Sequence, residues 1–186
     1  MSGHLSRLTW CQPEHCLSSR PGREISRWLL DEGSLTARLI EHCQGEFHVR
    51  VLSVNRATPT PDEISALAMR PRNQALIRQV LLYCNQQPVV YARTIIPLSS
   101  LRGALRGLVH LGTRPLGAVL FADKTMRRRP MEISRLKAGH ICHTWTQYKG
   151  KADIWGRRSV FVLKNRELLV SEFFLPTLFE QQSKEK

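Results

Sequence analysis

Two charged side chains, Arg78 and Glu172, stand alone among apolar neighbours in segments typical of β-strands. Side chains at positions i, i+2 and i+4 of a strand share one face of the sheet. The two rows that contain these charges are Leu76, Arg78, Val80 and Leu82, and Leu168, Val170, Glu172 and Phe174. Arg and Glu are almost never fully buried unless they are paired, and an unpaired buried charge costs several kcal/mol. Both residues are therefore candidates for chemistry.

Three interpretations of these two charges compete. They could form a structural ion pair with each other, or reach solvent at the rim of the sheet. They could instead line a ligand pocket, in which Arg78 binds a carboxylate bidentately and Glu172 accepts a hydrogen bond from a hydroxyl group. A shift of one residue in strand register would place both charges on the outer face. The pattern alone does not decide among the three.

The elements that must position these residues are strands and paired helices. Apolar runs predict six strands, over residues 47–54, 75–83, 89–96, 131–136, 154–163 and 167–174. Helical spacing predicts a helix-turn-helix over 24–43, with Ser34 as the N-cap of its second helix, and another over 98–121 that pauses before Pro115. A short helix is expected near 62–68. Strands joined mainly as hairpins, with helices inserted between them, indicate an α+β fold with one antiparallel sheet.

The composition fits a single domain. With 186 residues, 42% of them apolar, the chain can form one core; we assign residues 1–186 to one domain, with 1–23 and 177–186 as peripheral tails. No apolar run is long enough to span a membrane, and no signal-peptide pattern follows Met1, so a cytoplasmic location is expected. We expect no exposed apolar stripe once the helices pack, which favours a monomer.

The net charge of +13, from 28 Lys and Arg against 15 Asp and Glu, would attract an anionic partner. The basic residues are dispersed, and the cluster at 127–129 has no interleaved aromatic residues. We interpret this cluster as a solvated strand entry and expect no nucleic-acid partner.

Five cysteines at irregular spacing are interpreted as free thiols. The Cys and His residues near 11–16 and 140–143 fit the spacing of ordinary zinc modules poorly, so no metal is expected.

Six segments, taken in order, resemble the chorismate lyase family, the chorismate–pyruvate lyases of bacterial ubiquinone biosynthesis. The segments are WLLDEGSLT (28–36), LIRQVLL (76–82), ARTIIP (92–97), GTRPLG (112–117), IWGRRS (154–159) and LLVSEFFLP (168–176). The resemblance implies a six-stranded antiparallel sheet with two helix-turn-helix flaps over an internal site. It also implies a cofactor-free reaction that converts chorismate to 4-hydroxybenzoate and pyruvate, the first committed step of ubiquinone biosynthesis.

The resemblance also implies roles for particular residues. Arg78 corresponds to the arginine that receives the ring carboxylate, and Glu172 to the glutamate near the ring hydroxyl. Leu35 and Leu116 correspond to positions that contribute to substrate binding from the two flaps, partly through backbone amides.

Two further arginines, Arg93 and Arg158, are second candidates. Either could receive the enolpyruvyl carboxylate of chorismate or serve as a structural ion-pair partner.

The chain departs from the family at Ala92, where Gly is frequent, and at Leu35, where Met is common; both changes concern pocket shape rather than chemistry. The stretch 140–151 is longer than in compact family members, and the sequence assigns it no role.

A protein that senses a small molecule is the main alternative to an enzyme. The same fold type forms the effector-binding half of some bacterial transcription regulators, where the pocket binds without catalysis. A DNA-binding winged helix should precede such a domain, and residues 1–23 are too few to form one. Formation of 4-hydroxybenzoate from chorismate would distinguish the two functions.

Overall fold

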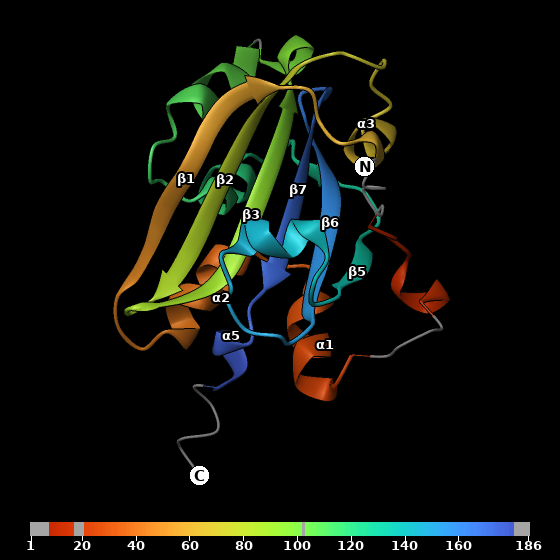
Figure 1. Cartoon of the computed structure of the whole chain (residues 1–186). Coiled ribbons are helices and arrows are strands. Elements are labelled where there is room, and N and C mark those ends of the chain that lie inside the picture. Colours follow the sequence, from red (N-terminus) through yellow and green to blue (C-terminus); the bar gives the residue numbers. More distant parts are fainter. Residues whose placement is uncertain (1–7, 17–20, 102, 181–186) are drawn as a thin grey trace.

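A computed structural model describes residues 8–16, 21–101 and 103–180. Its centre is one antiparallel sheet of seven strands (Figure 1), in the order β1-β2-β3-β7-β6-β4, with β5 also paired to β6. The strands are β1 (Phe47–Ala57), β2 (Ala75–Cys84), β3 (Gln87–Pro97), β4 (Arg127–Arg128), β5 (Glu132–Leu136), β6 (Ile154–Leu163) and β7 (Arg166–Phe174). The α+β fold with a single antiparallel sheet is confirmed, and each of the six predicted strands is present. The short β4 is an additional strand.

Helices cover both faces of the sheet, which explains the strong apolar signal of its central strands. One face is covered by α1 (Arg23–Leu29), α2 (Leu35–His42), η3 (Gly103–His110) and α4 (Leu116–Ala122). The other face is covered by α3 (Pro61–Ala66) and η4 (Ile141–Thr146). Figure 1 shows η4 in front of the sheet and α2 behind it. The short helices η1 (Pro13–His15), η2 (Leu98–Ser100) and α5 (Thr177–Glu180) lie at connections and ends.

Two helix-turn-helix units form the flaps on the first of these faces. The first flap consists of α1, α2 and the turn between them; the second consists of η3, α4 and their turn. The predicted N-cap is confirmed, because the Ser34 hydroxyl accepts a hydrogen bond from the Ala37 amide at 3.3 Å. The first arm of the second flap is a 3₁₀-helix rather than the expected α-helix. Its two glycines, Gly103 and Gly107, disfavour an α-helix in so short a segment.

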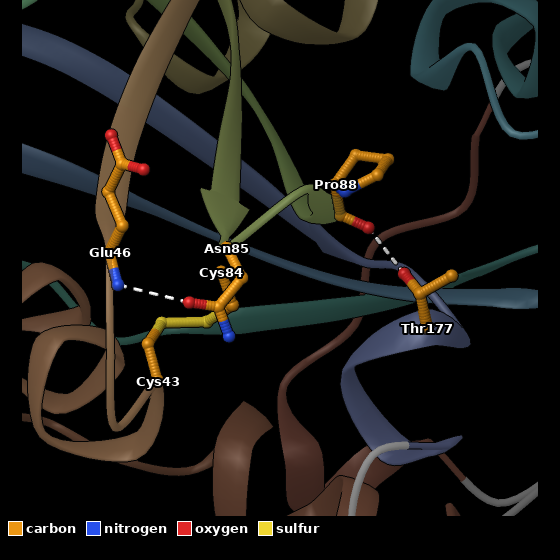
Figure 2. Close-up of a disulfide and its surroundings, with 6 residues drawn as sticks. All are labelled: Cys43, Glu46, Cys84, Asn85, Pro88 and Thr177. Atoms are coloured by element: carbon orange, nitrogen blue, oxygen red, sulfur yellow. Dashed lines mark hydrogen bonds between the residues drawn. A yellow bond between two sulfur atoms is a disulfide. The ribbon is translucent and has the colours of Figure 1, made fainter.

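The expectation of free cysteines is wrong for four of the five. Cys43, which follows α2, forms a disulfide with Cys84 at the end of β2, with a Cα–Cα distance of 5.1 Å. Figure 2 shows that this bond fastens the first flap to the β2–β3 hairpin. A second disulfide joins Cys11 to Cys16, and Cys142 is free and buried. The sequence did not predict the Cys43–Cys84 pair, because the two residues are 41 positions apart and only the pairing of β1 with β2 brings them together.

The described parts of the predicted tails are attached to the domain rather than peripheral. Cys11 exchanges two backbone hydrogen bonds with Ile133 of β5. Leu178 in α5 is fully buried, and the Thr177 hydroxyl donates to the carbonyl of Pro88 (Figure 2). Residues 177–180 of the expected C-terminal tail therefore pack against the domain. Among the described helices, none has the length and apolar character needed to cross a membrane.

Candidate active site

A cavity of about 50 Å³ lies between the sheet and the two flaps. Its wall is mainly apolar and includes Val49, Val80, Leu82, Ala92, Leu120, Phe121, Phe161 and Val170. A cavity known to bind benzene in another protein measures roughly 150 Å³. The cavity must therefore widen before a six-membered ring can enter. Because the sheet is a continuous hydrogen-bonded unit, we expect this widening to come from movement of the flaps.

The predicted flap residues Leu35 and Leu116 both line this cavity. Each is the first residue of its helix, α2 or α4, so its backbone N–H has no acceptor within the helix. The flaps touch each other beside these residues: a Cβ added to Gly117 of α4 would lie 2.9 Å from Oγ1 of Thr36 in α2. The two flap helices are therefore in close contact beside the cavity.

Arg78 extends from β2 into the cavity and is 4% exposed. Its Nη2 donates to the carbonyls of Gly112 and Arg114, at 2.9 and 3.3 Å, in the turn of the second flap. Its Nε is buried and has no hydrogen-bond partner among the described residues. Burial lowers the pKa of Arg78, and no carboxylate of the described chain contacts it. The guanidinium therefore has the capacity to bind an anion.

Glu172 lies on β7 and lines the same cavity, but its ion-pair partner is Arg157 rather than Arg78. Arg157 lies directly opposite Glu172 on β6, and its Nε donates to Glu172 Oε2 at 2.6 Å. The Nη1 atom of Arg157 donates to three carbonyls at the end of α1 and in the following turn, those of Trp28, Leu29 and Asp31. Arg157 is 1% exposed. It fixes both the carboxylate and the base of the first flap.

A third arginine, Arg128 of β4, also lines the cavity. Its Nε donates to the Ser159 hydroxyl at 2.9 Å, and its Nη1 donates to the carbonyl of Glu32 at 3.2 Å. The interpretation of the 127–129 cluster as a solvated strand entry is therefore wrong for its middle member. Side chains alternate along the strand, so Arg127 and Arg129 are exposed while Arg128 is half-buried and points inward.

Sequence reasoning missed Arg157 and Arg128. The signal for Arg157 was its place in a strand row with Phe161, another residue that lines the cavity. The neighbouring row contains Arg158 in an equally apolar setting, so β6 alone does not identify which arginine faces the site. No sequence signal identified Arg128, since its strand has two residues.

The structure does not bring Arg93 and Arg158 together with Arg78 and Glu172. Arg93 is next to the cavity residue Ala92 on β3, and Arg158 is next to the cavity residue Arg157 on β6. Adjacent side chains of a strand point to opposite faces, so both arginines lie on the face of the sheet away from the cavity. Arg93 forms a bidentate ion pair with Glu63, at 2.7 and 3.1 Å, and Arg158 bonds Glu132 at 2.8 Å and Asp62 at 3.1 Å. Burial alone would lower the pKa of Arg93, but its bonds to Glu63 more than offset this and raise it. We do not carry these two arginines forward as substrate ligands.

The long stretch 140–151 packs against the Arg93–Glu63 ion pair on that opposite face. The ring of Trp145, within η4, lies 4.8 Å from the guanidinium carbon of Arg93. Burial raises the pKa of Cys142 to about 11, with Asp62 contributing. A second cavity of about 110 Å³ lies here, between η4, α3 and β3. Within the described residues, no group of three or more His, Cys, Asp and Glu side chains is arranged to hold a metal ion.

Comparison with known proteins identifies relatives across the chain. The sequence model of the family described as "Chorismate lyase" matches residues 4–184. A probable chorismate pyruvate-lyase of Methylococcus capsulatus is 41% identical over 155 residues, which cover 83% of this chain and 96% of the relative. A probable chorismate pyruvate-lyase of an Azoarcus species is 43% identical over 171 residues, covering 86% and 90%.

Solved structures with a similar fold include an effector domain and a domain of a repressor. The effector domain of PhnF from Mycobacterium smegmatis aligns with a TM-score of 0.59 and 12% identity, covering 78% of this chain and 90% of that domain. The C-terminal domain of the histidine utilization repressor from Pseudomonas syringae gives a TM-score of 0.54 and 10% identity, covering 71% and 93%. At these identities the likeness shows a shared fold alone.

Proposed function

The chain belongs to the chorismate lyase family, and we propose that it converts chorismate to 4-hydroxybenzoate and pyruvate in ubiquinone biosynthesis. The observation that carries the proposal is the cavity between the sheet and the flaps, whose wall includes the charged side chains of Arg78 and Glu172. Arg78 lies there without an anionic partner among the described residues, and Glu172 lies on the same face two strands away. This arrangement suits an aromatic ring with a carboxylate at one end and a hydroxyl at the other.

In the proposed complex, Arg78 binds the ring carboxylate and Glu172 binds the C4 hydroxyl group. The backbone amides of Leu35 and Leu116 supply further donors from the flaps. Arg78 and Glu172 are two strands apart across the sheet, and Glu172 is offset by two residues along its strand. These two separations place their Cα atoms roughly 12 Å apart. Both side chains line the cavity from these positions.

The proposed reaction breaks the C3–O bond of chorismate, and the bonding electrons go to the enolpyruvyl oxygen. The C4 proton leaves, and the electrons of the C4–H bond complete the aromatic ring. The proton finally bonds the methylene carbon of the enol, which becomes the methyl group of pyruvate. Aromatisation drives the reaction, so the protein contributes orientation and fixed charges. A general-base role of Glu172 toward the C4 proton is part of the proposal.

The direct test incubates the purified protein with chorismate, without added metal. We expect 4-hydroxybenzoate, measured by absorbance, and an equal amount of pyruvate, measured with lactate dehydrogenase and NADH. Arg78→Ala should reduce kcat/KM roughly 100-fold or more, because it removes a charge-assisted bidentate contact. The control is Arg56→Ala, which removes an exposed strand arginine and should leave turnover unchanged.

Three results would contradict parts of the proposal. Binding of chorismate without release of pyruvate would favour a sensor of the kind represented by the structurally similar effector domains. Unchanged chorismate with no binding would remove the substrate assignment. Full turnover by Arg78→Ala, with an intact circular dichroism spectrum, would remove Arg78 from the site.

The proposal also takes the active form to be a monomer. The large apolar side chains that are exposed in the described residues are scattered over separate elements: Leu30, Ile40, Val54, Val109 and Phe121. Scattered single residues do not form the contiguous patch that a stable interface needs. Light scattering coupled to size-exclusion chromatography should give the mass of a single 21.4 kDa chain.

A further inference from the structure

The charge on the cavity wall is not balanced by the protein itself. The titratable side chains that line the cavity are Arg78, Arg128, Arg157 and Glu172. Three guanidinium charges against one carboxylate leave a net charge of +2. Buried and half-buried charges are costly unless they are paired, so the site favours occupants that carry two negative charges.

The three arginines differ in how completely their charges are compensated. Arg157 pairs with Glu172 and donates to three backbone carbonyls, so its charge is compensated and its Nε and Nη1 atoms already have acceptors. Arg78 and Arg128 contact neutral oxygens only, and no carboxylate within the described ranges forms a salt bridge with either. Burial lowers the pKa of Arg128, and the nearby Arg157 lowers it further; the carboxylates of Glu172, Glu32 and Asp31 have smaller opposing effects on this pKa.

The two uncompensated cations approach the cavity from opposite sides. Arg78 belongs to β2, and Arg128 belongs to β4 with its Nε against Ser159 of β6. The strands β3, β7 and β6 lie between β2 and β4 in the sheet order. Glu172 on β7 lies between the two arginines, and a single carboxylate is too small to bridge both. Two anionic groups on one ligand, separated by a ring, would satisfy both cations.

We infer that Arg128 binds the carboxylate of the enolpyruvyl side chain and thereby distinguishes the dianionic substrate from the monoanionic aromatic product. This inference rests on the proposed function, because it takes chorismate as the substrate. Arg78 binds the ring carboxylate, which substrate and product share. Arg128 binds the carboxylate that leaves with pyruvate. Loss of Arg128 therefore affects chorismate and leaves 4-hydroxybenzoate bound as before.

The test compares Arg128→Gln with the wild-type chain in two assays, chorismate turnover and binding of 4-hydroxybenzoate by calorimetry. We expect kcat/KM for chorismate to fall about 30-fold or more, mainly through KM, while Kd for 4-hydroxybenzoate changes less than about threefold. Arg128→Lys, which keeps the charge, should recover part of the lost kcat/KM. Arg78→Gln should weaken both turnover and product binding.

Arg127→Gln is the matched control, because Arg127 is the exposed neighbour of Arg128 on the same two-residue strand. It should change neither assay, and thermal unfolding should show that Arg128→Gln remains folded. Wild-type turnover by Arg128→Gln would overturn the inference, as would an equal loss of chorismate turnover and product binding. A wild-type chain that does not convert chorismate would instead overturn the proposed function itself.

Discussion

The contact between the flaps at Gly117 gives a prediction about access to the site. Replacing Gly117 with Ala adds a Cβ that would lie 2.9 Å from Thr36 Oγ1, whereas ordinary contacts begin at 3.4 Å. Unless the Thr36 side chain rotates, relief of this clash requires the flaps to separate by the difference, 0.5 Å. Overpacking of this kind costs about 1–3 kcal/mol. Because the clash exists only while the flaps are together, the cost falls on the closed state.

A cost of about 1–3 kcal/mol on the closed state multiplies the open population by roughly 5 to 150, at 1.4 kcal/mol for each factor of ten. The release rate of 4-hydroxybenzoate, measured by stopped-flow fluorescence, should rise within this range in Gly117→Ala. If flap opening limits turnover, kcat should rise as well. Without ligand, hydrogen exchange of the α2 and α4 amides should become faster.

A second substitution tests whether Thr36 is the cause. In the double variant Gly117→Ala/Thr36→Ala the Oγ1 atom is absent, and the nearest remaining atoms are Ser34 Oγ at 3.5 Å and the Cβ of residue 36 at 3.6 Å. Both are ordinary contacts, so release and exchange should return toward wild-type rates. Gly107→Ala is the matched control on the same flap, since a Cβ there meets no atom within 4 Å. Wild-type release by Gly117→Ala, or no recovery in the double variant, would refute the argument.

Two further predictions concern stability. Arg157→Met should lower the free energy of unfolding in urea by about 3–5 kcal/mol, because it leaves the Glu172 carboxylate and three carbonyls without their donor. Glu172→Gln should cost less than about half of this, since an amide oxygen can still accept from Arg157; equal losses would contradict the pairing described here. Replacing both Cys43 and Cys84 with Ala should cost up to about 4 kcal/mol without reductant, from the loop that their disulfide closes. Dithiothreitol should lower the stability of the wild-type chain by at least a similar amount, because it also reduces the Cys11–Cys16 disulfide; an unchanged wild-type midpoint would contradict this.

The disulfides also bear on the expected cytoplasmic location, which stays a prediction. Cytosolic proteins mostly keep their thiols reduced, and disulfides persist in oxidising compartments. A cytoplasmic chain should therefore carry Cys43 and Cys84 as thiols in the cell and oxidise them after lysis. Alkylation before lysis, followed by mass spectrometry, measures this directly, and protected cysteines would indicate an oxidising compartment.

Strands were the part of the fold that the sequence predicted best. Because both faces of β2, β3 and β6 are covered, their apolar runs are nearly continuous and are bounded by turn residues or Pro97. The pairing of β4 with β6 was missed, since two consecutive arginines carry no strand signal. These two arginines form a strand because they pair with the free edge of β6. The short β4 pairs with one part of this edge, and β5 pairs with the other part.

A site residue could be predicted from the sequence only where the pattern within its own strand was sufficient to identify it. Arg78 and Glu172 were found because each is the single charge in its own apolar row. The partner of Glu172 was not found, because Arg157 and Arg158 occupy adjacent positions in rows of similar apolar character. The choice between them depends on the register of β6 against β7, which places Arg157 opposite Glu172. Register is a property of two strands and their connections, so single-strand periodicity does not contain it.

The pairing of Arg157 with Glu172 determines how many charges remain for a ligand. Were Glu172 paired with Arg78, one of the two ends of the cavity would be neutral before any ligand arrived. Because Arg157 compensates Glu172, the carboxylate is held in place while Arg78 and Arg128 both remain available. A simple benzoate can contact only one of these cations, so it lacks the second charge-assisted contact that a dianionic ligand can make. The cavity therefore selects by number of charges as well as by shape, and the charges that remain after internal pairing set that number.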